Sequence, residues 1–311
     1  MTLAQKNDIV ALIETEKVRL GSGEAVAAKV KISSATISNM LNGKWADIST
    51  QMWRKVGDAL GYRPSGWQMA EINNTRIMAQ VLMDAKEKHL HIAVSYRAGS
   101  GKTAAIKEFA AANASSGVYA LMCREWGRKE FLVSLCATLG IATGRGLNTP
   151  DAQLQAVCEA LNKRANLNPL LVIDEADKLR PAALRALITL YNETEGRVGV
   201  VIAGTENLRI EVQRGIKLGV KGMDEIDSRF GRRYIQLGGI SKADVKAICA
   251  ANGLADASRQ EQVWNSCEPY KTVVNDRTVQ LVDDLRRVRR CVERELMMRE
   301  TELLTSENVM A

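Results

Sequence analysis

The sequence predicts an α/β protein in which a parallel sheet with flanking helices lies between two helical regions. Three observations predict this architecture. Between about residues 70 and 238, short β-branched runs alternate with amphipathic stretches, which is the pattern of βαβ units. Residues 1–62 are helical in pattern and end at a cluster of helix breakers, residues 61–66. From about residue 240 onward the pattern is helical again. We therefore expect domains at residues 1–62, 63–238 and 239–311.

Five apolar runs are expected to form the strands of the sheet. Each is four or five residues long and rich in β-branched side chains, as buried parallel strands are. The runs are residues 91–94, 118–122, 170–173, 198–202 and 234–237. Beyond them, a long charged helix is expected from about Val282 to Leu304.

Composition narrows the class of protein. The chain has 311 residues, enough for two or three domains, and a formal net charge of +7, which is compatible with binding a polyanion. No apolar run approaches the ~20 residues of a membrane span, and Lys6 and Asp8 interrupt the stretch where a signal peptide would be apolar. Six cysteines without a C-x-x-C pair suggest reduced, mostly buried thiols. We expect a cytoplasmic protein, with no membrane partner.

A glycine-rich loop directly follows the first expected strand. Gly99-Ser100-Gly101-Lys102-Thr103 then leads into a helical stretch, which is the context of a phosphate-binding loop. The glycines let backbone N–H groups wrap the phosphates, and the helix N-terminus adds its dipole. Lys102 would reach the β- and γ-phosphates of ATP, and the Thr103 hydroxyl would ligate Mg²⁺. The predicted ATP-binding residues are Ala98, Gly99, Ser100, Gly101, Lys102, Thr103 and Ala104.

One position departs from the full phosphate-loop pattern G-x-x-x-x-G-K-[ST]. Tyr96 stands where the first glycine is expected. Tyr96 lies outside the part of the loop that binds the phosphates. The departure therefore affects the geometry at the entry of the loop. The alternative is an accidental glycine-rich turn.

An acid pair ends the third expected strand. Asp174 and Glu175 follow the buried run 170–173 directly, so they lie at the strand edge where α/β folds bind ligands. Asp174 suits the Mg²⁺ shell, and Glu175 is expected to polarise the attacking water. The alternative is a solvated acidic turn. Asp177 has no evident chemical role and is expected to be structural.

Two more segments fit a nucleotide site. Thr205 follows the fourth strand, expected beside the end of the second, where its hydroxyl could contact the γ-phosphate or the water. Arg229, with Arg232 in reserve, comes just before the last strand, and an arginine delivered to a neighbouring subunit would neutralise transition-state charge. The predicted catalytic residues are thus Lys102, Glu175, Thr205 and Arg229. The alternative for the arginines is a surface position.

The two histidines of the chain flank the start of the first strand. A metal pair or a general base would need a cysteine or carboxylate cluster beside His89 and His91, and the sequence offers none. We expect surface or strand-edge histidines.

The N-terminal region fits a helix-turn-helix template. Ala27 is small where the first helix packs, Ile32 is apolar inside the turn, and Ser33 can cap the second helix. Lys31 departs from the glycine usual in the turn. The exposed face of the second helix would present short hydrogen-bonding side chains to DNA, with a lysine for phosphate. The predicted contacts are Ser34, Thr36, Ser38, Asn39 and Lys44. The alternative is a small helical bundle with polar outer faces.

The order of these motifs resembles that of the AAA+ ATPases over roughly residues 70–300. Within them, the chain resembles the transposition ATP-binding proteins of the phage MuB type. The resemblance rests on residues 172–177, on Ser228-Arg229 with Arg232-Arg233, and on residues 242–248. It implies a P-loop AAA+ sheet with a helical C-terminal lid, and ATP-dependent oligomers that wind around double-stranded DNA without sequence preference. It also implies a transposase as partner, and a place in the cytoplasm of a bacterium or of a phage-infected host.

Basic residues after the second strand and in the next loop are candidate phosphate contacts. They are Arg124, Arg128, Lys129 and Arg145. The alternative for each of them is a solvated positive charge without a DNA contact. The charged C-terminal helix either carries a second sensor, Arg286, or is simply a charged face, which we favour because its arginines alternate with acids.

The expected function is that of an ATPase, with ATP and Mg²⁺ as cofactors, that oligomerises on target DNA and delivers it to a transposase. ATP hydrolysis would drive disassembly. The alternatives are a replication accessory ATPase of the helicase-loader kind and a DNA-binding regulator switched by ATP.

Overall fold

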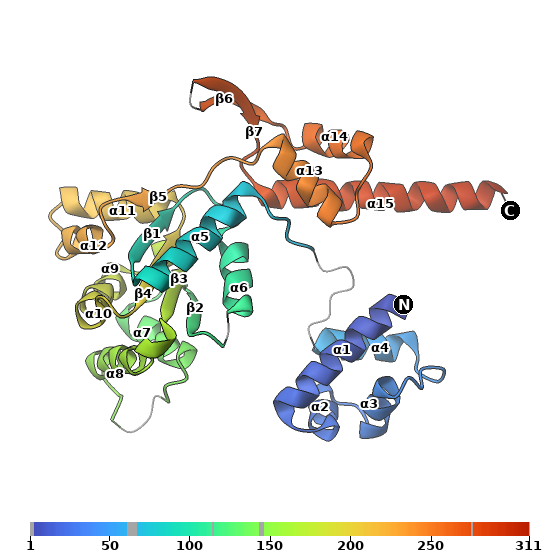
Figure 1. The fold of residues 1–311 in the computed structure, drawn as a ribbon, viewed down its shortest axis with the longest axis horizontal. Coiled ribbons are helices and arrows are strands. Elements are labelled where there is room, and N and C mark those ends of the chain that lie inside the picture. Colours follow the sequence, from blue (N-terminus) through green and yellow to red (C-terminus); the bar gives the residue numbers. More distant parts are fainter. Residues whose placement is uncertain (1–2, 61–66, 114, 143–145, 275, 311) are drawn as a thin grey trace. The chain divides into compact units, whose positions relative to one another are not determined.

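The computed structural model describes residues 3–60, 67–113, 115–142, 146–274 and 276–310. The chain divides into two compact units, Met1–Gln68 and Met69–Ala311, each of which is described by itself (Figure 1). The predicted breaker cluster at residues 61–66 and the predicted DNA contact Arg145 lie outside the described residues.

The first unit consists of four helices around a small apolar core. They are α1 (Leu3–Leu20), α2 (Gly23–Val30), α3 (Ser34–Leu41) and α4 (Thr50–Ala59). Trp53 is fully buried at the centre of this core, together with Ile37 and Met40. The Ser33 hydroxyl accepts the Thr36 N–H at 3.2 Å and so caps α3 as expected. Lys31 has a left-handed backbone (φ 58°) at the end of α2, a conformation that glycine usually supplies.

The second unit is built on a five-stranded parallel sheet, as predicted. Its strands are β1 (His91–Ser95), β2 (Val118–Met122), β3 (Leu170–Asp174), β4 (Gly199–Gly204) and β5 (Tyr234–Ile235), in the order β2-β3-β4-β1-β5. β4 therefore lies between β1 and β3. The expectation that Thr205 lies beside the end of the second strand is wrong, because β3 separates β4 from β2.

Helices cover both faces of the sheet (Figure 1). Val201 and Ala203 of β4 pack into the core on one face, and Val200 and Ile202 into the core on the other, as the two-residue strand period requires. The first face is covered by α5 (Asn73–Lys88) and α6 (Lys102–Ala112). The second is covered by α7 (Arg128–Thr138), α8 (Pro150–Lys163), α9 (Pro181–Leu184), α10 (Ala186–Thr194), α11 (Glu206–Lys217) and α12 (Met223–Arg229). Two short 3₁₀ turns, η1 (Ala165–Leu167) and η2 (Ala176–Lys178), flank β3.

A C-terminal region, residues 242–310, follows β5, and we refer to it as the lid. It contains α13 (Lys242–Ala251), α14 (Ala257–Ser266), an antiparallel hairpin of β6 (Tyr270–Val274) and β7 (Arg277–Leu281), and α15 (Leu285–Met310). The hairpin corrects the expectation that this region is wholly helical, since both arms are rich in valine and threonine, which favour strands. α15 begins three residues later than predicted, where the Asp284 carboxylate accepts the Arg286 N–H at 2.8 Å.

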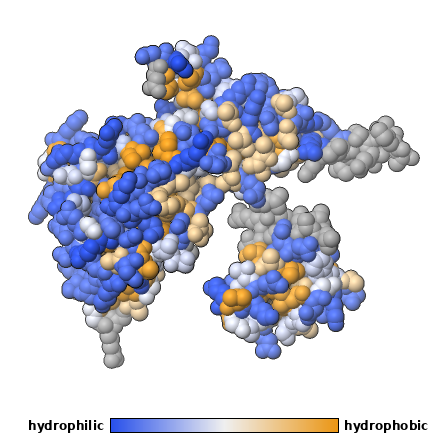
Figure 2. Space-filling view, in the orientation of Figure 1, coloured by the Kyte–Doolittle hydropathy of each residue, from blue (hydrophilic) through white to orange (hydrophobic). Residues whose placement is uncertain are grey.

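The remaining compositional expectations concern thiols, surface and membrane. All six cysteines are buried and free, as predicted. Hydrophilic side chains cover much of the second unit in the view of Figure 2. Within the described part of the chain, no helix is both long and apolar enough to span a membrane.

Candidate active site

The phosphate loop connects β1 to α6. Gly99 and Gly101 have left-handed backbones, with φ of 78° and 94°, which is the reason glycine is needed at these two positions. α6 begins at Lys102 without a side-chain cap, so the N–H groups of its first turn are available to an anion. The loop therefore has the backbone geometry that a phosphate requires.

Tyr96 stands at the entry of this loop, at the position of the missing glycine. Its φ is not in the left-handed region, and its N–H donates to the Gly204 carbonyl at 3.3 Å, which extends the pairing of β1 with β4. The ring is half-buried against the apolar core under α5 and α6. Because the backbone here is ordinary, the loop entry does not require glycine.

Lys102 is the buried cation of the site, with 7% of its surface exposed. Its ammonium donates to the carbonyls of Tyr96 at 2.7 Å and Arg97 at 2.9 Å, and to the Ser100 hydroxyl at 3.1 Å. Burial lowers the pKa of Lys102, while the carboxylates of Asp174 and Asp177 oppose that shift. The ammonium is thus held by residues of the phosphate loop itself.

Asp174 ends β3 and is 3% exposed. Its Oδ1 accepts the Glu175 N–H at 2.9 Å, whereas its Oδ2 is buried and has no hydrogen-bond partner among the described residues. Burial raises the pKa of Asp174, and the neighbouring Thr103 hydroxyl lowers it. A buried carboxylate oxygen without a partner, next to a threonine hydroxyl, fits Mg²⁺, which binds through one or two protein oxygens and the phosphates of its nucleotide.

Glu175 follows with a left-handed backbone, φ 55°, which is uncommon for a residue other than glycine. Its Oε2 lies 2.7 Å from the ammonium of Lys178, on the η2 turn. This pairing raises the pKa of Lys178. The carboxylate is half-buried and lies next to Asp174, so the structure brings the predicted water-activating group and the predicted metal ligand together.

Thr205 is held from two sides at the end of β4. Its backbone N–H donates to Asp177 Oδ1 at 3.2 Å and its hydroxyl to Asp177 Oδ2 at 2.7 Å. The Ser95 hydroxyl donates to the Thr205 carbonyl at 2.8 Å. Asp177, to which sequence reasoning gave only a structural role, therefore contacts a predicted catalytic residue. The sequence feature that could have indicated a role for Asp177 is its position two residues after the acid pair.

Arg229 lies at the other end of β1. Its guanidinium donates to Asn192 Oδ1 through Nε at 3.2 Å and Nη2 at 3.1 Å, pairs with Glu225 at 3.3 Å, and covers the Tyr191 ring at 5.6 Å. The Tyr191 ring in turn contacts His91, the first residue of β1. The phosphate loop follows the last residue of β1, so the strand, about 13 Å long, separates Arg229 from it. The reserve candidate Arg232 pairs with Asp224 at 3.2 Å.

The histidines show no metal site. His91 packs against Tyr191 and Phe230, and its burial lowers its pKa to about 4, so the expectation of a surface or strand-edge position is incomplete for it. His89 ends α5 with its Nε2 at 3.2 Å from Asn168 Oδ1. Among the residues described, no group of three or more His, Cys, Asp or Glu could hold a metal ion.

Comparison with known proteins decides the class of this site. A family model described as "AAA domain" matches residues 85–210, a span that contains the phosphate loop, the acid pair and Thr205. The chain carries an AAA-type ATPase domain. This domain indicates an ATPase, as expected. No curated protein matches the chain.

One solved structure shows the same fold for this ATPase. Cdc6p from Pyrobaculum aerophilum is 18% identical, with a TM-score of 0.50, over 66% of this chain and 57% of that one. The ORC2 protein of Aeropyrum pernix, in ADPNP–ADP complexes, is 14% identical with a TM-score of 0.42, over 71% of this chain and 66% of that one. The ATPase thus spans a little over half the length of the Cdc6p chain.

The lid of the ATPase contacts the phosphate loop directly. The Leu285 N–H donates to the Gly99 carbonyl at 2.9 Å, and Arg97 pairs with Asp283. A Cβ on Gly99 would collide with Asp284, and one on Gly101 would lie 2.8 Å from Leu285 Cδ1. Gly99 is therefore required by the lid as well as by its backbone angle, whereas at Gly101 the Leu285 side chain could move aside. Arg286 is the next residue of α15, and its charge lowers the pKa of Lys102.

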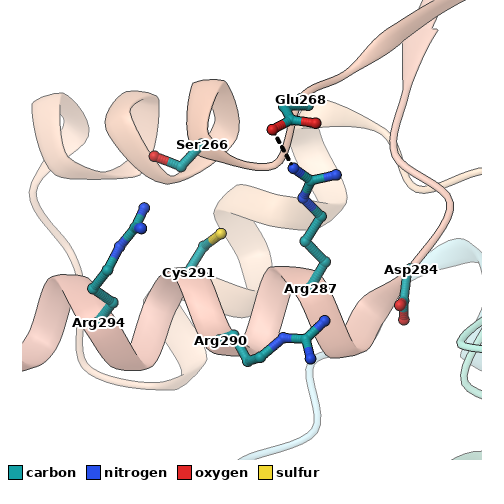
Figure 3. Close-up of a pocket in the computed structure, with 7 residues that line it drawn as sticks. All are labelled: Ser266, Glu268, Asp284, Arg287, Arg290, Cys291 and Arg294. Carbon is teal, nitrogen blue, oxygen red and sulfur yellow. Dashed lines mark ion pairs between the residues drawn. The ribbon is translucent and has the colours of Figure 1, made fainter.

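The lid also contains a basic cavity of about 600 Å³ between the end of α14 and α15 (Figure 3). Arg287 on its wall pairs with Glu268 at 2.5 Å. Arg290 and Arg294 are exposed and have no ion-pair partner among the described residues.

The predicted DNA contacts are placed on two separate units. In the ATPase unit, Arg124 and Lys129 are exposed, whereas Arg128 pairs with Asp151. In the first unit, the predicted contacts of α3 and the following turn are exposed except for Thr36, which is half-buried with its hydroxyl 2.8 Å from that of Ser33. The exposed ones are Ser34, Ser38, Asn39 and Lys44.

Proposed function

We propose that this ATPase assembles on double-stranded target DNA as a homo-oligomer and delivers that DNA to a transposase, and that ATP hydrolysis drives disassembly. The observation that supports an oligomer is the position of Arg229, which lies at the end of β1 away from its own phosphate loop. An arginine placed there is far from the nucleotide of its own subunit, and it could serve a neighbour's nucleotide by exchanging its contacts with Asn192 and Glu225 for the phosphate. The transposase partner is supported by the resemblance of the sequence to the MuB type.

The residues of the site divide the work of hydrolysis. Lys102 and the N–H groups of the loop bind and orient the β- and γ-phosphates, which is most of what phosphoryl transfer asks of a protein. Thr103 and Asp174 would hold Mg²⁺, and the ion would neutralise phosphate charge. Glu175 accepts a proton from the attacking water while the oxygen of that water bonds to the γ-phosphorus. The β–γ bridging oxygen leaves with ADP.

DNA binding is assigned to both units. In the first, α2 and α3 with their tight turn form a helix-turn-helix, and α3 presents exposed Ser34, Ser38 and Asn39 to the groove. In the ATPase unit, Arg124 and Lys129 are exposed charges for the phosphate backbone. The net charge of +7 favours both contacts.

Mixing two inactive variants tests the shared site. Arg229→Ala keeps its own Glu175, and Glu175→Gln keeps its own Arg229, so neither alone forms a complete site. A mixed oligomer contains interfaces where an intact Glu175 meets an intact Arg229. We expect each variant to lose at least about 10²-fold in kcat, and the mixture with duplex DNA to regain a substantial part of the parent rate. A mixture as inactive as its components would exclude the shared site.

Electron microscopy with duplex DNA and a slowly hydrolysed ATP analogue tests the assembly. The proposal requires ATP-dependent filaments on random-sequence duplex, and no filaments from Lys102→Ala, which cannot bind the phosphates. Binding at a single operator would instead identify an ATP-switched regulator. Assembly with a replicative helicase, and no stimulation of strand transfer, would identify a helicase-loader-like ATPase.

A further inference from the structure

We propose that Asp177 is a positioning residue for ATP hydrolysis, which fixes the Thr205 hydroxyl as a hydrogen-bond acceptor for the attacking water. This inference rests on the role proposed above for Glu175 and on the prediction from the sequence that Thr205 could contact the attacking water. It adds a residue to the site and gives the direction of a hydrogen bond.

The contacts of the Thr205 hydroxyl determine that direction. A threonine hydroxyl has one proton to donate and two lone pairs that accept. The proton goes to Asp177 Oδ2 at 2.7 Å, and one lone pair accepts the Asn207 N–H at 3.3 Å. A single acceptor position remains. Thr205 can therefore accept a proton from a water molecule, whereas it would have to give up Asp177 in order to donate to a phosphate oxygen.

Asp177 is itself well placed to hold this arrangement. Both of its carboxylate oxygens bind Thr205, one at the backbone N–H and one at the hydroxyl. The approach is close enough that a Cβ on Gly204 would lie 2.6 Å from Asp177 Oδ1, so the glycine at the end of β4 is required by this contact. From the β1 side, the Ser95 hydroxyl holds the Thr205 carbonyl at 2.8 Å. The threonine is thereby fixed through its N–H, its carbonyl and its hydroxyl.

The chemistry of the water explains why an acceptor is useful. A water that attacks phosphorus directs an oxygen lone pair at the γ-phosphate, so both of its protons point away. Glu175 takes one proton as the O–P bond forms and the bond to the leaving ADP oxygen breaks. The second proton needs an acceptor, and the free lone pair of Thr205 provides one. Asp177 and Glu175 are two residues apart on the η2 segment, so one short turn sets both acceptors.

A double-mutant cycle tests this role. Thr205→Val removes the hydroxyl at constant shape. In Asp177→Asn, the amide oxygen can still accept the Thr205 N–H. The amide N–H then donates to the Thr205 hydroxyl, which reverses this hydrogen bond. The lone pair of Thr205 that would accept the water is thereby occupied. We expect each variant to lose about 10²-fold in kcat, with the affinity for a fluorescent ATP analogue within about 3-fold of the parent. Since both remove the same acceptor, the double variant should lose no more than either single one.

Controls separate this role from a structural one. Thr205→Ser keeps the hydroxyl and should retain kcat within about 3-fold, and Asp84→Asn removes an equivalent carboxylate from a surface pair with Lys88 and should match the parent. Parent-like turnover by Asp177→Asn, or losses that multiply in the double variant, would overturn the inference. If Asp177→Asn does not fold, parent-like turnover by Thr205→Val overturns it equally. Parent-like turnover by Glu175→Gln would instead reject the proposed site.

Discussion

The ammonium of Lys178 lies 2.7 Å from Oε2 of Glu175, three residues earlier in the chain. The residue that is to accept a proton from water is thus already bound to a cation. Lys178 is partly exposed, and partly exposed ion pairs are worth up to about 1 kcal/mol. Glu175 must release this partner, or share it, when it turns to the water.

Lys178→Met should therefore raise the basal ATPase rate. The variant removes the competing cation and keeps the aliphatic chain, so the carboxylate no longer has to break an ion pair. We expect kcat to rise about 2- to 5-fold, which corresponds to the free energy of such an ion pair. The affinity for ATP should be unchanged. Steady-state hydrolysis measures this. Lys88→Met, which removes a pair of the same 2.7 Å length on α5, serves as the control, and a fall in kcat for Lys178→Met would refute the prediction.

Asp174→Asn should stabilise the protein without ligand while disabling it. Burial raises the pKa of Asp174 in the folded chain, so the folded chain binds this proton more tightly than the unfolded chain does. Stability is then greatest below the ordinary pKa of the group, and it falls as pH rises through the raised one. The unfolding free energy of the variant should not fall with pH in this way. At neutral pH it should exceed that of the parent by roughly 1 kcal/mol, because the group at the position of the partnerless Oδ2 no longer carries charge. Denaturant unfolding with and without Mg²⁺-ATP measures both effects. The stabilisation that the parent gains from Mg²⁺-ATP should be largely lost.

Tyr96→Gly should restore the common phosphate-loop sequence and give no gain in nucleotide binding. The backbone at residue 96 is ordinary and bonded to Gly204, so the glycine brings only the loss of ring packing and added freedom of the unfolded chain. We expect a loss of about 2–3 kcal/mol in unfolding free energy and an unchanged affinity for ATP at temperatures where the protein is folded. A clear gain in affinity would show that the tyrosine distorts the loop.

Arg124→Gln with Lys129→Gln should weaken duplex binding uniformly over sequences. If both contact phosphates, the slope of log affinity against log salt should fall by about 2. Arg290→Gln with Arg294→Gln removes the same charge from the lid cavity (Figure 3) and serves as the matched control. Equal losses in the two pairs would mean that net charge, and not a defined contact, governs binding. Titrations at several salt concentrations distinguish these outcomes.

The local chemistry of the site could be predicted because each motif is continuous in sequence. The glycine loop, the Asp174-Glu175 pair and the five β-branched runs are set by neighbouring residues, and the sheet confirms the runs within one or two residues. The contact of Asp177 with Thr205 could not be predicted, because it depends on β4 lying next to β3. The β6–β7 hairpin was missed because two five-residue runs joined by a short turn stand between long helical patterns.

The lid contact at Gly99 also bears on how this ATPase can be divided. The Gly99 carbonyl is bound by the Leu285 N–H, and Arg97 by Asp283, so part of the wall of the nucleotide site comes from almost two hundred residues further along the chain. A fragment that stops after β5 would keep every residue predicted to bind ATP or to act in catalysis. It would nevertheless lack the surface on which its phosphate loop rests, and its nucleotide affinity would not represent that of the whole protein.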